Sequence, residues 1–190
     1  NIKTNTSLGE SLGLTGKTAV ITGGAVNIGR AISLKLGTLG VKIAVVYNSS
    51  AEKAQDLAKA INYADGMAAT FKADVSDESQ VIKLFKDIEE DDRFGRVDIL
   101  INNAGIFSVY EQTELSADEW QRLFNLNTMG TFLCSREAAK MMMRQTSADA
   151  DNSNSSAERG SIINIASINA IHPGFGGTVH YDATKGAVYT

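Results

Sequence analysis

Short apolar runs alternate along the chain with longer segments in which apolar residues recur every three or four positions. The runs have the length of strands, and residues 41–47 are almost entirely apolar, as expected for a strand covered on both faces. The pattern predicts buried β-strands over residues 17–22, 41–47, 67–73, 97–101 and 162–165.

Helical periodicity fills most of the intervals between these runs. The helices that it predicts cover residues 28–39, 77–93 and 117–144, with a last helix starting near His180. Two Ser-x-x-Glu pairs, Ser49 with Glu52 and Ser116 with Glu119, have the spacing of a capping box and predict further helix starts.

Strands that alternate with helices need crossover connections, so the predicted fold class is α/β, a three-layer, doubly wound parallel sheet. Ligands of such sheets bind outside the carboxyl ends of the strands. The residues that follow the predicted strands are polar or glycine: Gly23 and Gly24, Tyr47 and Asn48, Asp74, residues 102–105, and Ser167. Candidate chemistry is therefore expected at this edge.

Composition agrees with one packed domain over residues 1–190. The chain has 43% apolar residues and a single proline, which excludes a disordered or proline-rich protein. Residues 1–13 are expected to form an N-terminal arm. Residues 145–159 are rich in Ser, Asp, Asn and Ala, and are predicted to form a mobile polar loop.

Charge and cysteine content limit the partners and the compartment. The 18 basic and 22 acidic residues give a net charge of −4 without a basic cluster, so nucleic acid is not an expected partner. No apolar run approaches the roughly 20 residues of a membrane helix. The single cysteine, Cys134, suits a reducing cytoplasm. His172 and His180 lack a cluster of further ligands, so no metal site is expected.

The turn from Thr22 to Gly29 joins the first predicted strand to the first helix. Its backbone amides and the helix N-terminus suit the pyrophosphate of a dinucleotide. Taken alone, such a turn is equally compatible with a plain tight turn. Asn27 lies inside this turn, and asparagine tolerates left-handed backbone geometry.

Tyr181 and Lys185 share one face of the last predicted helix because they are four residues apart. They follow Ser167 by 14 and 18 residues. Asn127 lies inside the long helix predicted for residues 117–144.

Taken in order, these motifs resemble those of the short-chain dehydrogenase/reductase family. Thr22, Gly23 and Gly29 match its Thr-Gly-x-x-x-Gly-x-Gly motif, with Asn27 in place of the middle glycine, and residues 102–105 match its Asn-Asn-Ala-Gly segment. The resemblance implies a Rossmann-type fold and hydride transfer between a nicotinamide cofactor and a carbonyl or alcohol. It also implies that the C-terminal strands of the sheet, a sixth and a seventh, are missing from this chain.

The resemblance implies catalytic roles for Asn127, Ser167, Tyr181 and Lys185. Tyr181 is expected to be the general acid in reduction and the base in oxidation. An ammonium about 5 Å away, as Lys185 offers, stabilises a tyrosinate by about 3 kcal/mol at an effective dielectric constant near 20. Ser167 is expected to hydrogen-bond the substrate oxygen, and Asn127 to hold a water that relays protons towards Lys185.

The expected cofactor is NADP, and NAD stays open. Residues 47–50 carry no carboxylate to bind the adenosine ribose, and Ser49, Ser50 and Lys53 suit a 2′-phosphate. Val26 argues the other way, because many NADP-dependent relatives have Arg or Lys there. The expected cofactor-binding residues are Gly23, Ala25, Asn27, Ile28, Gly29, Tyr47, Asn48, Ser49, Asp74, Val75, Asn103, Ala104, Gly105, Tyr181 and Lys185. For Asp74 alone, a turn-capping role is the alternative.

The expected function is thus an NAD(P)-dependent alcohol dehydrogenase or carbonyl reductase, with a small carbonyl or alcohol compound as substrate. The alternative is a regulator that binds NAD(P) without turnover. Residues 168–179 are expected to line the substrate pocket, but they leave the substrate open. By fold analogy, the long helix is expected to pack in a homodimer or homotetramer.

Overall fold

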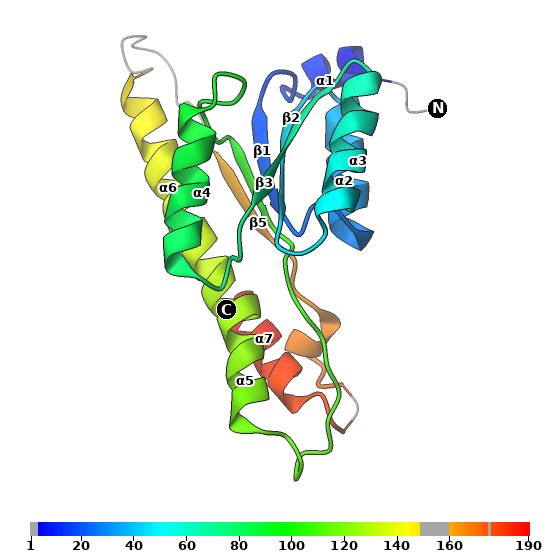
Figure 1. Ribbon diagram of the computed structural model, residues 1–190, viewed down its shortest axis with the longest axis vertical. Helices are drawn as coiled ribbons and strands as arrows, with labels where there is room; N and C mark the ends of the chain where they lie inside the picture. Colours follow the sequence, from blue (N-terminus) through cyan, green and yellow to red (C-terminus); the bar gives the residue numbers. More distant parts are fainter. Residues whose placement is uncertain (1–3, 149–159, 175) are drawn as a thin grey trace.

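The computed structural model describes residues 4–148, 160–174 and 176–190 (Figure 1). Within this part of the chain a parallel sheet has the strand order β3-β2-β1-β4-β5. The strands are β1 (Thr18–Thr22), β2 (Lys42–Tyr47), β3 (Met67–Lys72), β4 (Ile99–Asn102) and β5 (Ser161–Asn164). The predicted doubly wound α/β class is confirmed.

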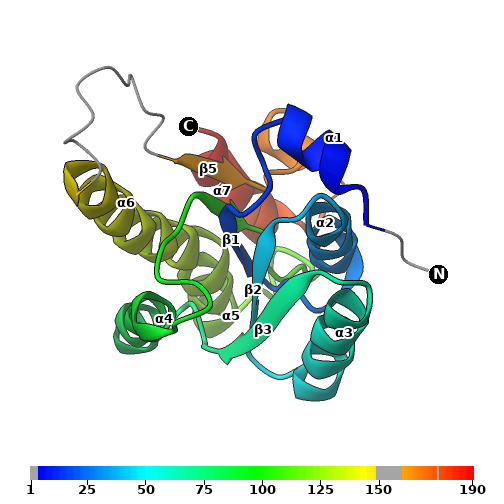
Figure 2. The ribbon, with the colours of Figure 1, turned by 90° about the horizontal axis from the view of Figure 1, so that it is seen from above.

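Helices cover both faces of the sheet, as Figure 2 shows. Those that flank the sheet are α2 (Asn27–Thr38), α3 (Ala51–Tyr63), α4 (Glu78–Glu90) and α6 (Gly130–Ala148). Four further elements lie beyond the carboxyl ends of the strands. They are α5 (Ala117–Leu123), the π-helical turn η1 (Phe124–Met129), the 3₁₀ turn η2 (Ile168–Ala170) and α7 (Val179–Tyr189). A short N-terminal helix, α1, spans Thr6–Ser11.

Two hydrophobic clusters fill the spaces between the three layers. Along β1 and β2 the side chains alternate between them: Val20 and Val46 pack with α4 and α6, whereas Ile21 and Val45 pack with α2 and α3. This alternation follows from the period of two in a strand. It explains why both strands are apolar throughout, because each face of the sheet is buried.

The strand order reverses at the boundary between β1 and β4. From β1 the chain adds β2 and β3 on one side, and then β4 and β5 on the other. The carboxyl ends of the strands lead into the loops in the lower half of Figure 1, beside α5 and α7. A crevice at such a switch point is where doubly wound sheets bind ligands.

The long helix predicted over residues 117–144 is present as α5, η1 and α6. Ser116 begins it as predicted, because its hydroxyl oxygen accepts the Glu119 backbone N–H. The predicted loop, however, does not begin at Gln145. The side chain of Gln145 accepts the Val97 N–H at 2.8 Å and donates to the Val97 carbonyl at 3.0 Å, so α6 continues to Ala148. The rest of the predicted loop, residues 149–159, lies outside the described residues.

The other predicted capping box is wrong. Helix α3 takes Ser50 as its N-cap, without a side-chain capping bond. Because α3 starts one residue later than the capping box requires, Ser49 lies outside the helix. Its hydroxyl is then too far from the amide of the third helical residue, which a capping hydroxyl must reach. In the N-terminal arm, α1 is joined to the end of α2 by the Asn5 N–H, which donates to the Thr38 carbonyl at 2.6 Å.

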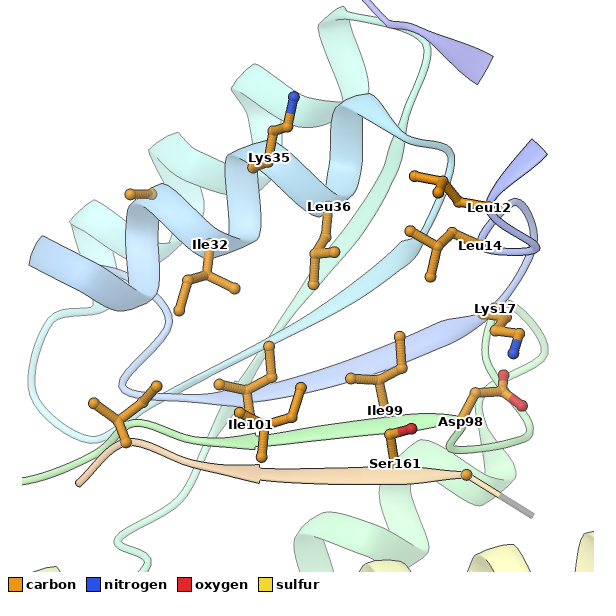
Figure 3. Close-up of a pocket in the computed structure, with 14 residues that line it drawn as sticks. Leu12, Leu14, Lys17, Ile32, Lys35, Leu36, Asp98, Ile99, Ile101 and Ser161 are labelled. Carbon is orange, nitrogen blue, oxygen red and sulfur yellow. The ribbon is translucent and has the colours of Figure 1, made fainter. Parts of the chain in front are cut away.

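An apolar cavity of about 680 Å³ lies between α2 and the β4–β5 side of the sheet (Figure 3). Ile32 and Leu36 of α2 point toward Ile99 and Ile101 across it. All four residues of β5, the last strand in the described part of the chain, are exposed. Lys17 and Asp98 lie at one end of the cavity, and none of the predicted catalytic residues lines it. Its lining also contains none of the residues predicted to bind a cofactor.

Candidate active site

The loops after β1 and β4 are joined where the strand order reverses. The Thr22 hydroxyl accepts the backbone N–H groups of Asn103 and Ala104, both at 3.0 Å. The Asn103 side-chain amide donates to the carbonyls of Thr22 and Gly23 at 3.0 and 3.1 Å. Asn103 was predicted to bind cofactor, and in the structure both its side-chain amide and its backbone N–H join the two loops.

In the glycine-rich turn, two backbone segments lie so close together that a side chain would not fit between them. Gly23 and Asn27 have φ angles of 62° and 47°, and a Cβ on Gly29 would lie 2.3 Å from the Gly23 carbonyl oxygen. Val26 precedes α2 without a side-chain capping bond, so the first amides of the helix lack a side-chain partner there. An uncapped helix N-terminus beside such a turn fits a pyrophosphate.

A cavity of about 240 Å³ adjoins this turn and is lined by the loops after β1 to β4. Of the predicted cofactor residues it contains Gly23, Ala25, Tyr47, Asn48, Ser49, Asp74, Val75, Ala104 and Gly105. The Asp74 carboxylate accepts hydrogen bonds from the Ser76 N–H and hydroxyl and from the Asn48 amide at 2.6–3.0 Å. Each carboxylate oxygen has two lone pairs. Asp74 can therefore cap its turn and still accept a bond from a cofactor, so the two roles predicted for it are compatible.

A second hollow, of about 550 Å³, lies between the starts of α2 and α3. It is lined by Ala25, Val26, Asn27, Arg30, Ser50, Lys53, Asp56 and Leu57. Arg30 and Lys53 are exposed cations, and Asp56 is the only carboxylate among these lining residues. The hollow shares Ala25, Val26 and Ser50 with the smaller cavity, so the two lie next to each other.

Tyr181 and Lys185 lie on α7, at the carboxyl ends of the strands. Lys185 is buried, its Nζ donates to the Ile165 carbonyl at 2.7 Å, and it lies 5.9 Å from the centre of the Tyr181 ring. Burial lowers the pKa of Lys185. The Tyr181 ring is half-buried, and the ring of Phe107 packs edge-on against it with a centroid distance of 4.9 Å.

Asn127 lies in the π-helical turn η1 and is buried. Its side chain accepts the Ile106 N–H at 2.8 Å, and donates to the Ile106 carbonyl at 3.0 Å and to the Thr184 hydroxyl at 3.1 Å. Asn127 thereby joins the segment after β4 to α7. A Cβ on Gly105 would lie 3.2 Å from Asn127 Oδ1 and 3.8 Å from Lys185 Nζ, so glycine allows this close approach.

Ser167 follows β5 and caps η2, where its hydroxyl accepts the Asn169 N–H at 3.2 Å. Because η2 packs against α7, Ser167 lies on the same edge as Tyr181. All four predicted catalytic residues thus lie on the elements that meet at the carboxyl edge of the sheet. His172 is exposed, and the described residues contain no His, Cys, Asp and Glu cluster that could hold a metal ion.

Two polar residues beside Tyr181, His180 and Asp182, are absent from the sequence prediction of the site. His180 is bonded to Ser108, and Asp182 accepts bonds from Asn169, Gly174 and Thr178. The two neighbours of Tyr181 thereby join the segments after β4 and β5 to α7. Only their position next to Tyr181 could have indicated from the sequence that His180 and Asp182 belong to the site. Most of their hydrogen-bond partners lie in other segments of the chain and cannot be predicted from spacing.

Comparison with known proteins gives the same family throughout. The sequence model of the family described as short chain dehydrogenase matches residues 17–190. Trihydroxynaphthalene reductase of Colletotrichum orbiculare is 38% identical over 130 residues, which cover 68% of this chain and 45% of the reductase. A short-chain type dehydrogenase/reductase of Picea abies is 40% identical over 139 residues, covering 69% and 51%.

A solved structure of a short chain dehydrogenase from Burkholderia cenocepacia J2315, in complex with NADP, superimposes with a TM-score of 0.80 at 31% identity. The match covers 92% of this chain and 65% of that one. The chain thus spans about half the length of the two curated relatives and about two thirds of the solved structure. In the described residues, no helix combines the length and hydrophobicity needed to cross a membrane.

Proposed function

Because the chain belongs to the short-chain dehydrogenase/reductase family, we propose that the whole protein transfers a hydride between NADP(H) and a carbonyl or alcohol. In this proposal it is an alcohol dehydrogenase or carbonyl reductase. The observation that best supports the proposal is that Lys185 lies 5.9 Å from the centre of the Tyr181 ring on α7, while Asn127 bonds both α7 and Ile106, which lines the 240 Å³ cavity. The relatives carry enzyme names, which gives no support to the alternative of a non-catalytic regulator.

The side chains divide the chemistry between them. The nicotinamide, when bound, supplies or accepts the hydride. The Tyr181 hydroxyl gives a proton to the carbonyl oxygen during reduction and takes it from the alcohol during oxidation. Lys185 stabilises negative charge on the Tyr181 oxygen, since its ammonium group lies 5.9 Å from the centre of the ring. Burial lowers the pKa of Lys185, so its own proton is released more readily than that of a free lysine.

Ser167 and Asn127 prepare the site for this proton transfer. Ser167 hydrogen-bonds the substrate oxygen in our proposal, from its position at the start of η2. Asn127 holds the backbone at Ile106 and the Thr184 hydroxyl on α7. Its further role is to keep a water that passes protons between solvent and Lys185.

NADP is the proposed cofactor, in preference to NAD. Residues 47–50 carry no carboxylate to repel a 2′-phosphate, and Arg30 and Lys53 line the adjoining hollow. One solved relative is described as a complex with NADP. A cation that pairs with phosphate contributes about 1.5–3 kcal/mol, so we expect NADPH to bind at least tenfold more tightly than NADH. Equal dissociation constants by fluorescence titration would exclude this preference.

Replacement of Tyr181 tests the proposed reaction. In the full-length protein, Tyr181→Phe should lower kcat for carbonyl reduction by about 10²–10⁴-fold, because the general acid is lost. The dissociation constant of NADPH should stay the same. Tyr63→Phe is a matched control, since Tyr63 is 93% exposed at the end of α3. Unchanged turnover of Tyr181→Phe would overturn the mechanism.

We further propose a homodimer or homotetramer. Trp120, Met129 and Phe132 expose 36%, 47% and 55% of their surface along α5, η1 and α6, which leaves apolar area for a second copy. Light scattering of the full-length protein at micromolar concentration should give at least twice the monomer mass. A monomer would exclude this assembly.

A cytoplasmic location is also proposed. Cys134 is fully buried, and burial raises the pKa of its thiol to about 12, so the thiol stays protonated. A single inert cysteine suits a compartment in which disulfides are not used. Fractionation of the native cells should recover the protein with cytoplasmic markers, and its recovery with another compartment would contradict the proposal.

A further inference from the structure

His180, directly before Tyr181, is fully buried although it is a titratable residue. Its Nε2 lies 2.9 Å from the Ser108 hydroxyl oxygen, and its ring lies 6.0 Å from the Tyr110 ring. Its Nδ1 has no hydrogen-bond partner among the described residues. Burying a polar atom without a partner costs free energy. The Nε2 bond to Ser108 is therefore the hydrogen bond that holds the ring in this position.

The bonds around Ser108 have a defined direction. Glu119 is ionised, because hydrogen bonds from Arg122 and Ser108 lower the pKa of its carboxyl to about 2. A carboxylate has no proton to donate, so the Ser108 hydroxyl donates to Glu119 Oε1 at 2.7 Å. The hydroxyl has only one proton and must therefore accept the bond from His180 Nε2–H. The direction of these bonds therefore places a proton on His180 Nε2.

This network holds the middle of the segment that follows Gly105. Every second residue of the segment is bonded to a neighbour: Ile106 to Asn127, Ser108 to His180 and Glu119, and Tyr110 N–H to the Gly177 carbonyl at 3.0 Å. The residues between them are exposed, Phe107 by 58% and Val109 by 59%.

Phe107 is the exposed residue that contacts the proposed acid. Its ring meets the Tyr181 ring edge-on, at an interplanar angle of 87°. Phe107 lies between the bonded residues Ile106 and Ser108, so the position of its ring depends on both bonds. His180 and Tyr181 are consecutive on α7, and the Ser108 bond therefore sets the distance from the segment to Tyr181.

We propose that His180 is a positioning residue for proton transfer, which acts through Ser108 to hold Phe107 against the ring of Tyr181. The inference rests on the proposed function of Tyr181. It assigns to Phe107 one wall of the substrate side, against the Tyr181 ring. His180 itself transfers no proton in the reaction.

The test uses the full-length protein and two variants that break the same bond, His180→Leu and Ser108→Ala. The assay follows NADPH oxidation with a panel of ketones, aldehydes, quinones and 3-oxo esters. Each variant should lower kcat/KM for the carbonyl by about ten- to a hundredfold, because small displacements near the reacting groups are costly. The dissociation constant of NADPH should stay within about twofold, since the cofactor cavity contains neither residue.

Two further variants separate positioning from general stability. The double variant should be no worse than Ser108→Ala alone, because Ser108→Ala already removes the bond to His180 together with the bond to Glu119. His180→Gln should recover most of the activity, since its amide can donate to Ser108. Ser11→Ala is the control for Ser108→Ala, because Ser11 lies on the exposed helix α1 and makes one local bond.

The outcomes are distinguishable. A wild-type protein that binds NADPH but reduces no carbonyl of the panel would contradict the proposed function and the inference together. An active wild type whose two variants keep kcat/KM within about twofold would contradict the inference alone, as would fully additive effects in the double variant. A parallel loss of NADPH affinity would show a merely structural role. If His180→Leu does not fold, Ser108→Ala decides.

Discussion

Asn27 satisfies a backbone requirement that glycine usually meets in its family. The residue has a φ of 47° at the start of α2, in the left-handed region. Asparagine enters this region at a lower cost than other residues with a Cβ, because its short polar side chain can bond locally. The departure from the family motif therefore leaves the shape of the turn intact.

Two substitutions at Asn27 should have opposite results. Asn27→Gly should leave stability and NADPH affinity nearly unchanged, since glycine adopts positive φ freely. Asn27→Val should destabilise the protein by about 1–2 kcal/mol, because a β-branched residue is strained there. Urea unfolding and NADPH titration measure both effects. Equal stability of the two variants would show that the backbone at residue 27 is not constrained.

At the scale of elements, the π-helical turn is what brings Asn127 into the site. A π turn adds one residue to the helical repeat, and such turns occur frequently at functional sites. Within η1 the Asn127 carbonyl accepts the Thr131 hydroxyl at 2.8 Å, and its side chain reaches Ile106 and Thr184. Periodicity predicts the long helix but not this local change in winding, because the neighbouring turns are regular.

Helix α4 offers a test of an N-cap and of its charge. Asp77 accepts bonds from Ser79 and Gln80, first of all from the Ser79 hydroxyl, and these bonds lower the pKa of its carboxyl to about 2 from the ordinary 3.8. The folded state therefore binds this proton less tightly than the unfolded state. The stability from ionised Asp77 is complete above pH 3.8 and is lost as the pH falls toward 2.

Asp77→Asn should keep the cap, since asparagine caps as well as aspartate, but remove this titration. Its free energy of unfolding should depend less on pH than that of the wild type between about pH 4 and pH 2. Asp77→Ala should destabilise α4 at neutral pH as well. Urea unfolding across this pH range gives the comparison, and parallel curves for wild type and Asp77→Asn would contradict the assigned pKa.

At the scale of the whole molecule, distant segments are joined by single polar side chains. Asn102 donates to both Ser135 and Asn164 at 2.9 Å, which joins β4 to α6 and β5. Gln145 bonds both backbone groups of Val97, 48 residues earlier, and so joins the end of α6 to the chain entering β4. Val97 is fully buried, so its backbone groups depend on Gln145.

Gln145→Ala should destabilise the protein by about 1–3 kcal/mol, because it leaves two buried backbone groups without their partner. Gln121→Ala is a suitable control, since Gln121 is exposed and donates only to Asn125 within the same helix. Urea unfolding of the two variants provides the measurement. A Gln145→Ala variant as stable as the control would show that the end of α6 is not needed to hold β4.

The sequence by itself determined the α/β class, the five strands of the described part and the order of the motifs. These properties depend on local periodicity and on residue types at fixed spacing, which a linear chain displays directly. Tyr181 and Lys185, for example, lie on one face of a helix because four residues make about one turn.

Only the tertiary structure decided which distant groups meet. The Asn103 side chain bonds the loop after β1. Gln145 lies in α6 and bonds Val97, although the sequence predicted it to lie in a loop. Ser108 lies beside His180, 72 residues away. These contacts depend on strand order and on the packing of α5 and α7. The spacing of residues along the chain predicts neither of these. The physical reason is that hydrogen bonds between remote segments form only once burial of apolar faces has set the distance between the layers.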